Sequence, residues 1–150
     1  MQKIIIGSDH GGFELKEYLK EELGKKGVTV EDVGTHSRES VDYPDIAAEL
    51  CAAVLREKPL FGIAICGTGI GISIACNKIK GIRAALCENT YSAAKARQHN
   101  DANVLALGGR TLGPELALAI VESFMSAEFE GGRHGRRVGK IMDLEAKGQC

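Results

Sequence analysis

The sequence predicts a single-domain α/β fold in which helices cover both faces of a five-stranded parallel sheet. Short apolar or β-branched runs alternate five times with longer amphipathic segments, which is typical of parallel strands joined by helical crossovers. The 150 residues, of which 44% are hydrophobic and 26% charged, suit one domain with a substantial core. We therefore expect a three-layer α/β/α, Rossmann-like domain over residues 1–150.

Each expected strand is a short apolar run bounded by glycine or polar residues. The third run has the length and composition of a strand buried on both faces. The five runs are Lys3 to Gly7, Gly27 to Val33, Phe61 to Ile65, Ile82 to Cys87 and Asn103 to Leu107.

The expected helices show apolar residues at helical spacing or a recognisable start. Pro44 suits a first turn, and Thr90 is a candidate N-cap. The last helix forms a basic C-terminal extension. The helices are expected over Phe13 to Leu23, Pro44 to Val54, the glycine turn to about Lys80, Thr90 to His99, Gly113 to Met125, and Arg133 to Ala146.

A glycine-rich turn follows the third expected strand. Gly67, Gly69 and Gly71 permit positive φ and close approach of another group, and the helix start leaves N–H donors unpaired. The turn could therefore cradle an anion, with Cys66 and Thr68 at its lip. The alternative is a tight strand-to-helix turn with a buried cysteine.

A second polar turn is expected to meet the first. Ligands of such sheets bind outside the carboxyl ends of the strands, commonly between the first and third. Asp9 and His10 end the first strand, whereas Cys66 and Thr68 end the third. Taken alone, Asp9 could be a helix N-cap and His10 a solvated loop residue. Their convergence with Cys66 favours a functional site.

The five cysteines show no CxxC spacing, which disfavours both a disulfide framework and a zinc cluster. We expect reduced thiols and no metal. Helix N-terminal donors near Cys66 would favour its thiolate and could stabilise an oxyanion on a bound carbonyl. The other four are expected to be structural or incidental.

His99 and Asn100 are expected at a helix end just before the fifth strand, which is the amino edge of the sheet. The alternative is an ordinary polar helix C-terminus. If His99 is catalytic, a second subunit must supply it to the Cys66 site, because the two groups occupy opposite edges.

A basic segment near the C-terminus could hold a phosphate. Arg133 and Arg137 lie four residues apart, so on a helix they share a face, with Lys140 on the same side. A solvated basic face is the alternative. The net charge of -1 gives no reason to expect nucleic acid or a membrane surface as partner. The first residues show no signal segment, and we expect a cytoplasmic protein.

In combination, five motifs resemble the sugar-phosphate isomerase family of ribose-5-phosphate isomerase B, which also contains allose- and galactose-6-phosphate isomerases. The likeness spans nearly the whole chain. The motifs are SDHGG at 8–12, DYP at 42–44, CGTGIGISIA at 66–75, RQHND at 97–101 and GGRH at 131–134.

The resemblance implies that ribose 5-phosphate and ribulose 5-phosphate are interconverted through a cis-enediolate, without metal or cofactor. It also implies a homodimer with shared sites, with a dimer of dimers as the alternative assembly. Cys66 would take the C2 proton with help from Thr68, and Asp9 would move protons between O1 and O2. His99, supported by Asn100, would open the furanose ring. The enediolate would be held by backbone N–H groups of Gly67, Thr68, Gly69, Ile70 and Gly71.

The same resemblance assigns the phosphate to His10, Arg133 and Arg137, with Tyr43 and Arg110 as further pocket residues. Some family members use a glutamate in the glycine turn as the base, but that position is Ile72 in this chain. Cys66 would therefore be the base.

Two other functions stay open. A hexose-6-phosphate isomerase would use the same chemistry in a deeper pocket. A non-catalytic sugar-phosphate or nucleotide sensor would be expected to show GxGxxG after the first strand with an acidic residue about twenty positions further on. The first strand is followed instead by the sequence SDHGG.

Overall fold

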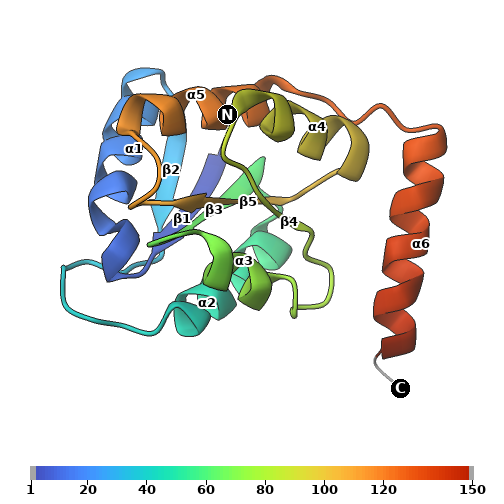
Figure 1. Ribbon diagram of the computed structural model, residues 1–150, viewed down its shortest axis with the longest axis horizontal. Coiled ribbons are helices and arrows are strands. Elements are labelled where there is room, and N and C mark those ends of the chain that lie inside the picture. The colour runs from blue at the N-terminus through green and yellow to red at the C-terminus, as the bar shows by residue number, and fades with distance from the viewer. Residues whose placement is uncertain (1–2, 149–150) are drawn as a thin grey trace.

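The computed structural model describes residues 3–148, which form one five-stranded, all-parallel sheet flanked by helices (Figure 1). The predicted fold class is confirmed. The strand order is β2-β1-β3-β5-β4, so β1 and β3 are neighbours and chain order reverses between them. The strands are β1 Lys3–Ser8, β2 Thr29–Asp32, β3 Phe61–Cys66, β4 Ala84–Leu86 and β5 Val104–Gly108.

The helices cover the sheet in two layers, with α1, α4 and α5 on one face and α2 and α3 on the other (Figure 1). The alternation of side chains in β1 divides the core accordingly, because Ile4 and Ile6 join the first layer while Ile5 joins the second. No helix within residues 3–148 combines the length and apolar content needed to cross a membrane. The helices are η1 His10–Gly12, α1 Phe13–Lys25, α2 Tyr43–Glu57, α3 Ile70–Cys76, α4 Thr90–Asn100, α5 Pro114–Ser126 and α6 Arg133–Gly148.

The last helix, α6, stands beside the three layers and packs on the side of α4 (Figure 1). Only His134 and Val138 of this helix are buried among its described residues. Apolar side chains such as Ile141 and Leu144 remain exposed. This is the predicted C-terminal helical extension, and it leaves an amphipathic face without intrachain cover.

Two predicted boundaries around α3 and α4 are wrong. The helix after the glycine turn ends at Cys76 instead of Lys80, because the Asn77 side chain pairs with both backbone groups of Ala84 at 2.8 and 2.9 Å. The N-cap of α4 is Asn89 instead of Thr90. Its side chain accepts the N–H of Ser92 at 2.7 Å, and its backbone is extended.

A buried ion pair fixes the end of β1. Lys16 is fully buried and pairs with Asp32, whose Oδ1 also accepts the N–H of Gly34 at 2.9 Å. Burial acts to raise the pKa of Asp32, but hydrogen bonds from Lys16, Lys20 and Gly34 outweigh it, so the pKa lies below its ordinary value. The carbonyl of Gly34 in turn accepts the N–H of Ser8 at 2.7 Å. The ion pair therefore holds the residue that precedes Asp9.

Candidate active site

Three turns meet where β1, β3 and β5 end. The N–H of Asp9 donates to the carbonyl of Ile65 at 3.1 Å, which joins the first turn to the third strand. The N–H groups of Gly109 and Arg110 donate to the carbonyls of Cys66 and Gly67 at 2.8 and 2.9 Å. The two turns expected to converge are thus joined by a third from β5, which lies next to β3.

Glycine is required for this close approach. A Cβ at Gly109 would lie 2.6 Å from the carbonyl oxygen of Gly11, and one at Gly11 would lie 3.0 Å from the nitrogen of Gly67. Gly69 has φ of 77°, and a Cβ there would lie 2.8 Å from the backbone of Leu107. Side chains at these positions would separate the three turns.

Asp9 is 6% exposed and serves as the N-cap of η1. Its Oδ1 accepts the N–H groups of Gly11 and Gly12 at 2.9 and 3.2 Å. Within residues 3–148, Oδ2 receives no hydrogen bond. The capping role that the sequence left open is therefore present, and it orients the carboxyl group while leaving one oxygen for a ligand.

Cys66 ends β3 and is 4% exposed. Its Sγ accepts the N–H of Gly69 at 3.1 Å, so a backbone dipole points at the sulfur. Cys87 lies in the core on the other face of the sheet, where burial raises the pKa of its thiol to about 11. Cys51 and Cys76 lie fully buried in the core between the sheet and α2 and α3. Cys150 lies outside the described residues.

Some backbone N–H groups of the glycine turn donate within the turn, and others have no acceptor among the described residues. Thr68 is exposed, and its Oγ1 accepts the N–H of Ile70 at 3.2 Å. Among residues 3–148, the N–H groups of Gly67, Thr68 and Gly71 have no hydrogen-bond acceptor. The turn therefore offers three donors, fewer than the five positions predicted, because Gly69 and Ile70 donate within the turn.

Tyr43 begins α2 and lies against the start of α3. A Cβ at Gly71 would lie 2.6 Å from Cζ of the Tyr43 ring and 2.9 Å from its hydroxyl oxygen. Tyr43 is 38% exposed, and its ring forms one wall beside the glycine turn.

A cleft of about 300 Å³ adjoins the first and third turns. The Nδ1 of His10 accepts the N–H of Val41 at 3.2 Å, so the neutral ring carries its proton on Nε2. The guanidinium of Arg110 lies over Gly67, with Nη1 3.3 Å from where a Cβ would stand. The cleft is lined by His10, Gly11, Glu14, Leu15, Arg38, Gly109 and Arg110.

Arg38 was missed by the sequence analysis. It comes from the polar loop between β2 and α2, and its Nε donates to Glu14 at 3.1 Å. In the sequence, Arg38 is only an arginine in the loop after the second expected strand, and nothing there indicates that β2 lies next to β1. With His10 and Arg110 it makes this cleft suited to an anion.

A second set of predicted site residues lies at the opposite edge of the sheet. His99 and Asn100 end α4, and the carbonyl of Asn100 accepts Nε of Arg83 at 3.0 Å, just before β4 begins. Cys66 pairs with Gly108 at the far end of β5. The chain therefore does not bring His99 to Cys66.

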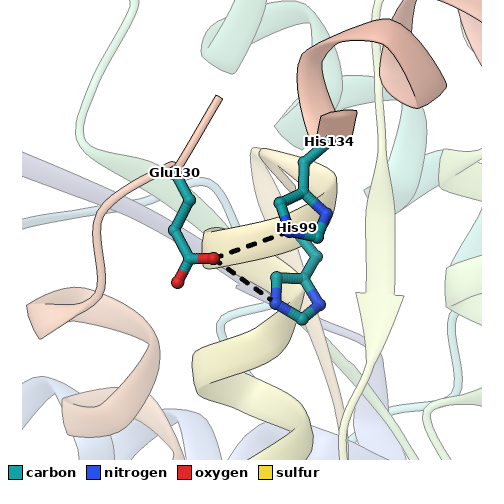
Figure 2. Close-up of side chains that lie close together, drawn as sticks. All are labelled: His99, Glu130 and His134. Carbon is teal, nitrogen blue, oxygen red and sulfur yellow. Dashed lines mark ion pairs between the residues drawn. The ribbon is translucent and has the colours of Figure 1, made fainter. Parts of the chain in front are cut away.

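Arg133 and Arg137 belong to this second set, because they lie on the first turns of α6 near the end of α4. Both are exposed. The ring of His99 stacks on that of His134, with centroids 4.0 Å apart, and Glu130 faces both rings (Figure 2). Glu130 was not predicted from the sequence.

A larger hollow of about 600 Å³ lies between β4 and α6. Its lining is mainly apolar and includes Ile82, Ala84, Ile141 and Met142, with Asn100 at one side. None of the residues at the carboxyl edge lines it. Because size alone does not provide reactive groups, we assign the chemistry to the smaller cleft and the adjoining turns.

Comparisons with known proteins agree with this arrangement. Residues 4–141 match the family model described as Ribose/Galactose Isomerase. Ribose-5-phosphate isomerase B of Escherichia coli (strain K12) is 50% identical over 147 residues, which cover 98% of this chain and 99% of that protein. D-erythrulose-4-phosphate isomerase of Pectobacterium atrosepticum is 46% identical over 142 residues, which cover 94% of this chain and 93% of that protein.

The structural comparison extends the likeness to the backbone. A solved structure of Clostridium thermocellum ribose-5-phosphate isomerase B superposes with a TM-score of 0.95 at 56% sequence identity. The match covers 97% of this chain and 99% of that one. The chain is therefore similar over nearly its whole length to sugar-phosphate isomerases that differ in the sugar they are named for.

Proposed function

The chain belongs to the ribose/galactose isomerase family, and on that premise we propose that it interconverts D-ribose 5-phosphate and D-ribulose 5-phosphate. The observation that carries the proposal is the meeting of Cys66, Asp9 and the glycine turn at one sheet edge. A carbon acid next to a carbonyl needs a base, donors for the enediolate oxygens and a group that moves protons between them. These three requirements correspond to the three features.

In the proposed reaction, the Cys66 thiolate removes the proton from C2 of the open-chain aldose. The C2–H electrons form the C1–C2 double bond of a cis-enediolate as the carbonyl oxygen at C1 gains negative charge. Unpaired N–H groups of the glycine turn stabilise that charge. Asp9 moves a proton between O2 and O1, and return of the proton from Cys66 to C1 gives the ketose. Thr68 assists the sulfur from the lip of the turn.

The phosphate is assigned to the cleft beside this edge. The N–H of Val41 donates to Nδ1 of His10, which leaves the Nε2 proton to donate to a phosphate. The guanidinium of Arg110 lies over Gly67 in the same region. The neutral His10 ring supplies a donor and no charge, so the cations of the cleft are Arg38 and Arg110. Arg133 and Arg137 are exposed and would add the charge that a dianion attracts. We assign the last two to a phosphate bound at the site of a second subunit.

We infer a homodimer with shared sites, because His99 and Cys66 of one chain lie at opposite sheet edges. His99, with Asn100 beside it, would open the furanose ring at the partner's Cys66 site. The exposed apolar face of α6, which includes Ile141 and Leu144, is suited to cover by a second copy. The four buried free thiols among the described residues fit a reducing, cytoplasmic setting.

The sugar is the open part of the proposal, since the family model names galactose as well as ribose. We would assay five- and six-carbon sugar phosphates in deuterated water without added metal. Exchange of the C2 hydrogen separates an isomerase from a non-catalytic sensor, and relative kcat/KM separates ribose 5-phosphate from allose or galactose 6-phosphate. A higher kcat/KM for a hexose phosphate would identify that sugar as the substrate in place of ribose 5-phosphate. Absence of exchange with every sugar phosphate would contradict the proposed isomerase activity.

Cys66→Ala tests the proposed base directly. Turnover and C2 exchange should fall by roughly 10² to 10⁴-fold, because a positioned general base is lost. Cys87→Ala is the matched control, since it also removes a buried thiol but lies in the core on the other face of the sheet. Near-native turnover of Cys66→Ala with an unchanged melting temperature would contradict the assignment.

A further inference from the structure

Three side chains with metal-ligating atoms meet at the end of α4, at the sheet edge opposite Cys66. His99 comes from the last turn of α4, Glu130 from the segment between α5 and α6, and His134 from the first turn of α6 (Figure 2). Their ligand atoms all lie within 4.8 Å of one another. The backbone N–H of Glu130 donates to the carbonyl of Gln98 at 3.0 Å, so the carboxylate is anchored beside α4.

The spacing is long for hydrogen bonds and suitable for a shared ion. Oε1 of Glu130 is 3.6 Å from Nε2 of His99 and 3.5 Å from Nε2 of His134. A tetrahedral ion with bonds of about 2.0 to 2.2 Å holds neighbouring ligand atoms about 3.4 Å apart. The two nitrogen-to-oxygen distances are thus close to the edges of such a tetrahedron. The rings are stacked within 6° of parallel, so their in-plane lone pairs do not converge, and the partly exposed His99 ring must rotate away from the stack before both nitrogens face one ion.

The charges around the cluster act on a cation in opposite directions. The carboxylate of Glu130, which faces both rings, attracts it. Arg133 precedes His134 in the chain and repels the cation, so we expect weaker binding than at a closed site with four protein ligands.

We propose that His99, Glu130 and His134 bind a divalent transition metal ion such as Zn²⁺, with one position of the ion left open. Two imidazoles and a carboxylate are the ligand set typical of such an open zinc site. The bound ion occupies the His99 nitrogen. Because the proposed function needs that ring to carry a proton, the ion acts as a reversible inhibitor of the isomerase, a consequence that rests on the proposed function.

Binding is tested by calorimetric titration of the full-length chain with Zn²⁺, which should give one ion per chain. Glu130→Gln and His134→Gln should each weaken binding by more than about tenfold, since a direct ligand is lost. His36→Gln is the matched control, because His36 lies outside the cluster and its side chain is 73% exposed. Equal affinity in Glu130→Gln, His134→Gln and the unmodified chain would overturn the site.

Cobalt distinguishes this cluster from a cysteine site. Co²⁺ bound to the unmodified chain should show d–d absorption without a thiolate charge-transfer band, and Glu130→Gln should lose that spectrum. A thiolate band would place the metal on a cysteine and overturn the proposal. Glu130 is about half exposed, so this variant should fold even if His134→Gln does not.

Inhibition is tested separately. Zn²⁺ should reduce turnover of the unmodified chain in proportion to site occupancy, and EDTA should restore it. Glu130→Gln should be less sensitive relative to its own metal-free rate. Full turnover at saturating, calorimetrically verified Zn²⁺ would overturn the inhibitory role. If no sugar phosphate is isomerised, the proposed function fails, whereas calorimetry and the cobalt spectrum still decide the metal site.

Discussion

Mixing two inactive variants should restore activity if the site is shared between subunits. Within one chain, the pairing of Gly62 with Val104 and of Cys66 with Gly108 places four residue steps of strand between the amino end of β5 and the Cys66 edge. At about 3.3 Å per step this is about 13 Å, far beyond the roughly 3 Å needed for direct proton transfer to a shared substrate atom. His99 precedes β5, so the same chain does not close this gap.

The expected recovery follows from random pairing of subunits. Cys66→Ala and His99→Ala homodimers each carry a defect at both sites. After full exchange about half of the dimers are mixed, and each mixed dimer has one site with both defects and one with neither. Activity should therefore rise towards about a quarter of the wild-type value at equal total protein.

The assay needs proof of exchange. The two variants carry different affinity tags, are mixed and incubated, and the doubly tagged dimer is isolated before turnover is measured. The isolated mixed dimer should reach about half of wild-type activity. If it stays as inactive as its parents, His99 either serves the Cys66 of its own chain or has no catalytic role, and the shared-site reasoning is wrong.

Three further changes probe the phosphate grip and the scaffold. Arg133→Ala or Arg137→Ala should raise KM for sugar phosphate and weaken competition by inorganic phosphate, with little change in melting temperature; unchanged values in both variants would indicate only a solvated face. Asp32→Asn should cost about 3 kcal/mol of unfolding free energy in urea at pH 7, because Lys16 loses its main buried partner. Since folding lowers the pKa of Asp32, its contribution is full above its ordinary value of 3.8 and is lost as pH falls through the lower folded value, so this variant should show a smaller acid-induced loss of stability. Ser8→Ala should be neutral or stabilising by up to about 1 kcal/mol, because the buried Ser8 hydroxyl has no hydrogen-bond partner among residues 3–148; a clear loss of stability would indicate a bound partner such as water.

The fold could be predicted because local signals agree with the final packing. The five apolar runs are the strands, and the β-branched run at Ile4 to Ile6 divides its side chains between two core layers as alternation requires. The end of α3 could not be predicted from local signals. It depends on Asn77 meeting Ala84 after a turn, and only the placement of β4 brings these residues together.

The meeting of Asp9 and Cys66 could be predicted from the sequence. Alternating parallel strands and helices place the turns after β1 and β3 at the same edge of the sheet. The strand order beyond β3 could not be predicted from the sequence. This order matters because β5 lies next to β3 and so brings Arg110 to the glycine turn. Arg38 and Glu130 come from loops without periodicity, so their positions depend on contacts with distant elements. Their residue types indicated charge but not location.

The exposed apolar residues next to the glycine turn connect the fold to the proposed dimer. Ile70 and Ile74 lie four apart on α3, share one helix face and are 52% and 57% exposed. Neighbouring exposed isoleucines beside the glycine turn form an apolar patch of the kind that a protein partner covers. A second copy that covers them would approach the Cys66 edge from the α3 side, which is the edge that lacks His99. The same contact would then both bury the apolar face and complete the site, so stability of the dimer and assembly of the catalytic groups would depend on the same residues.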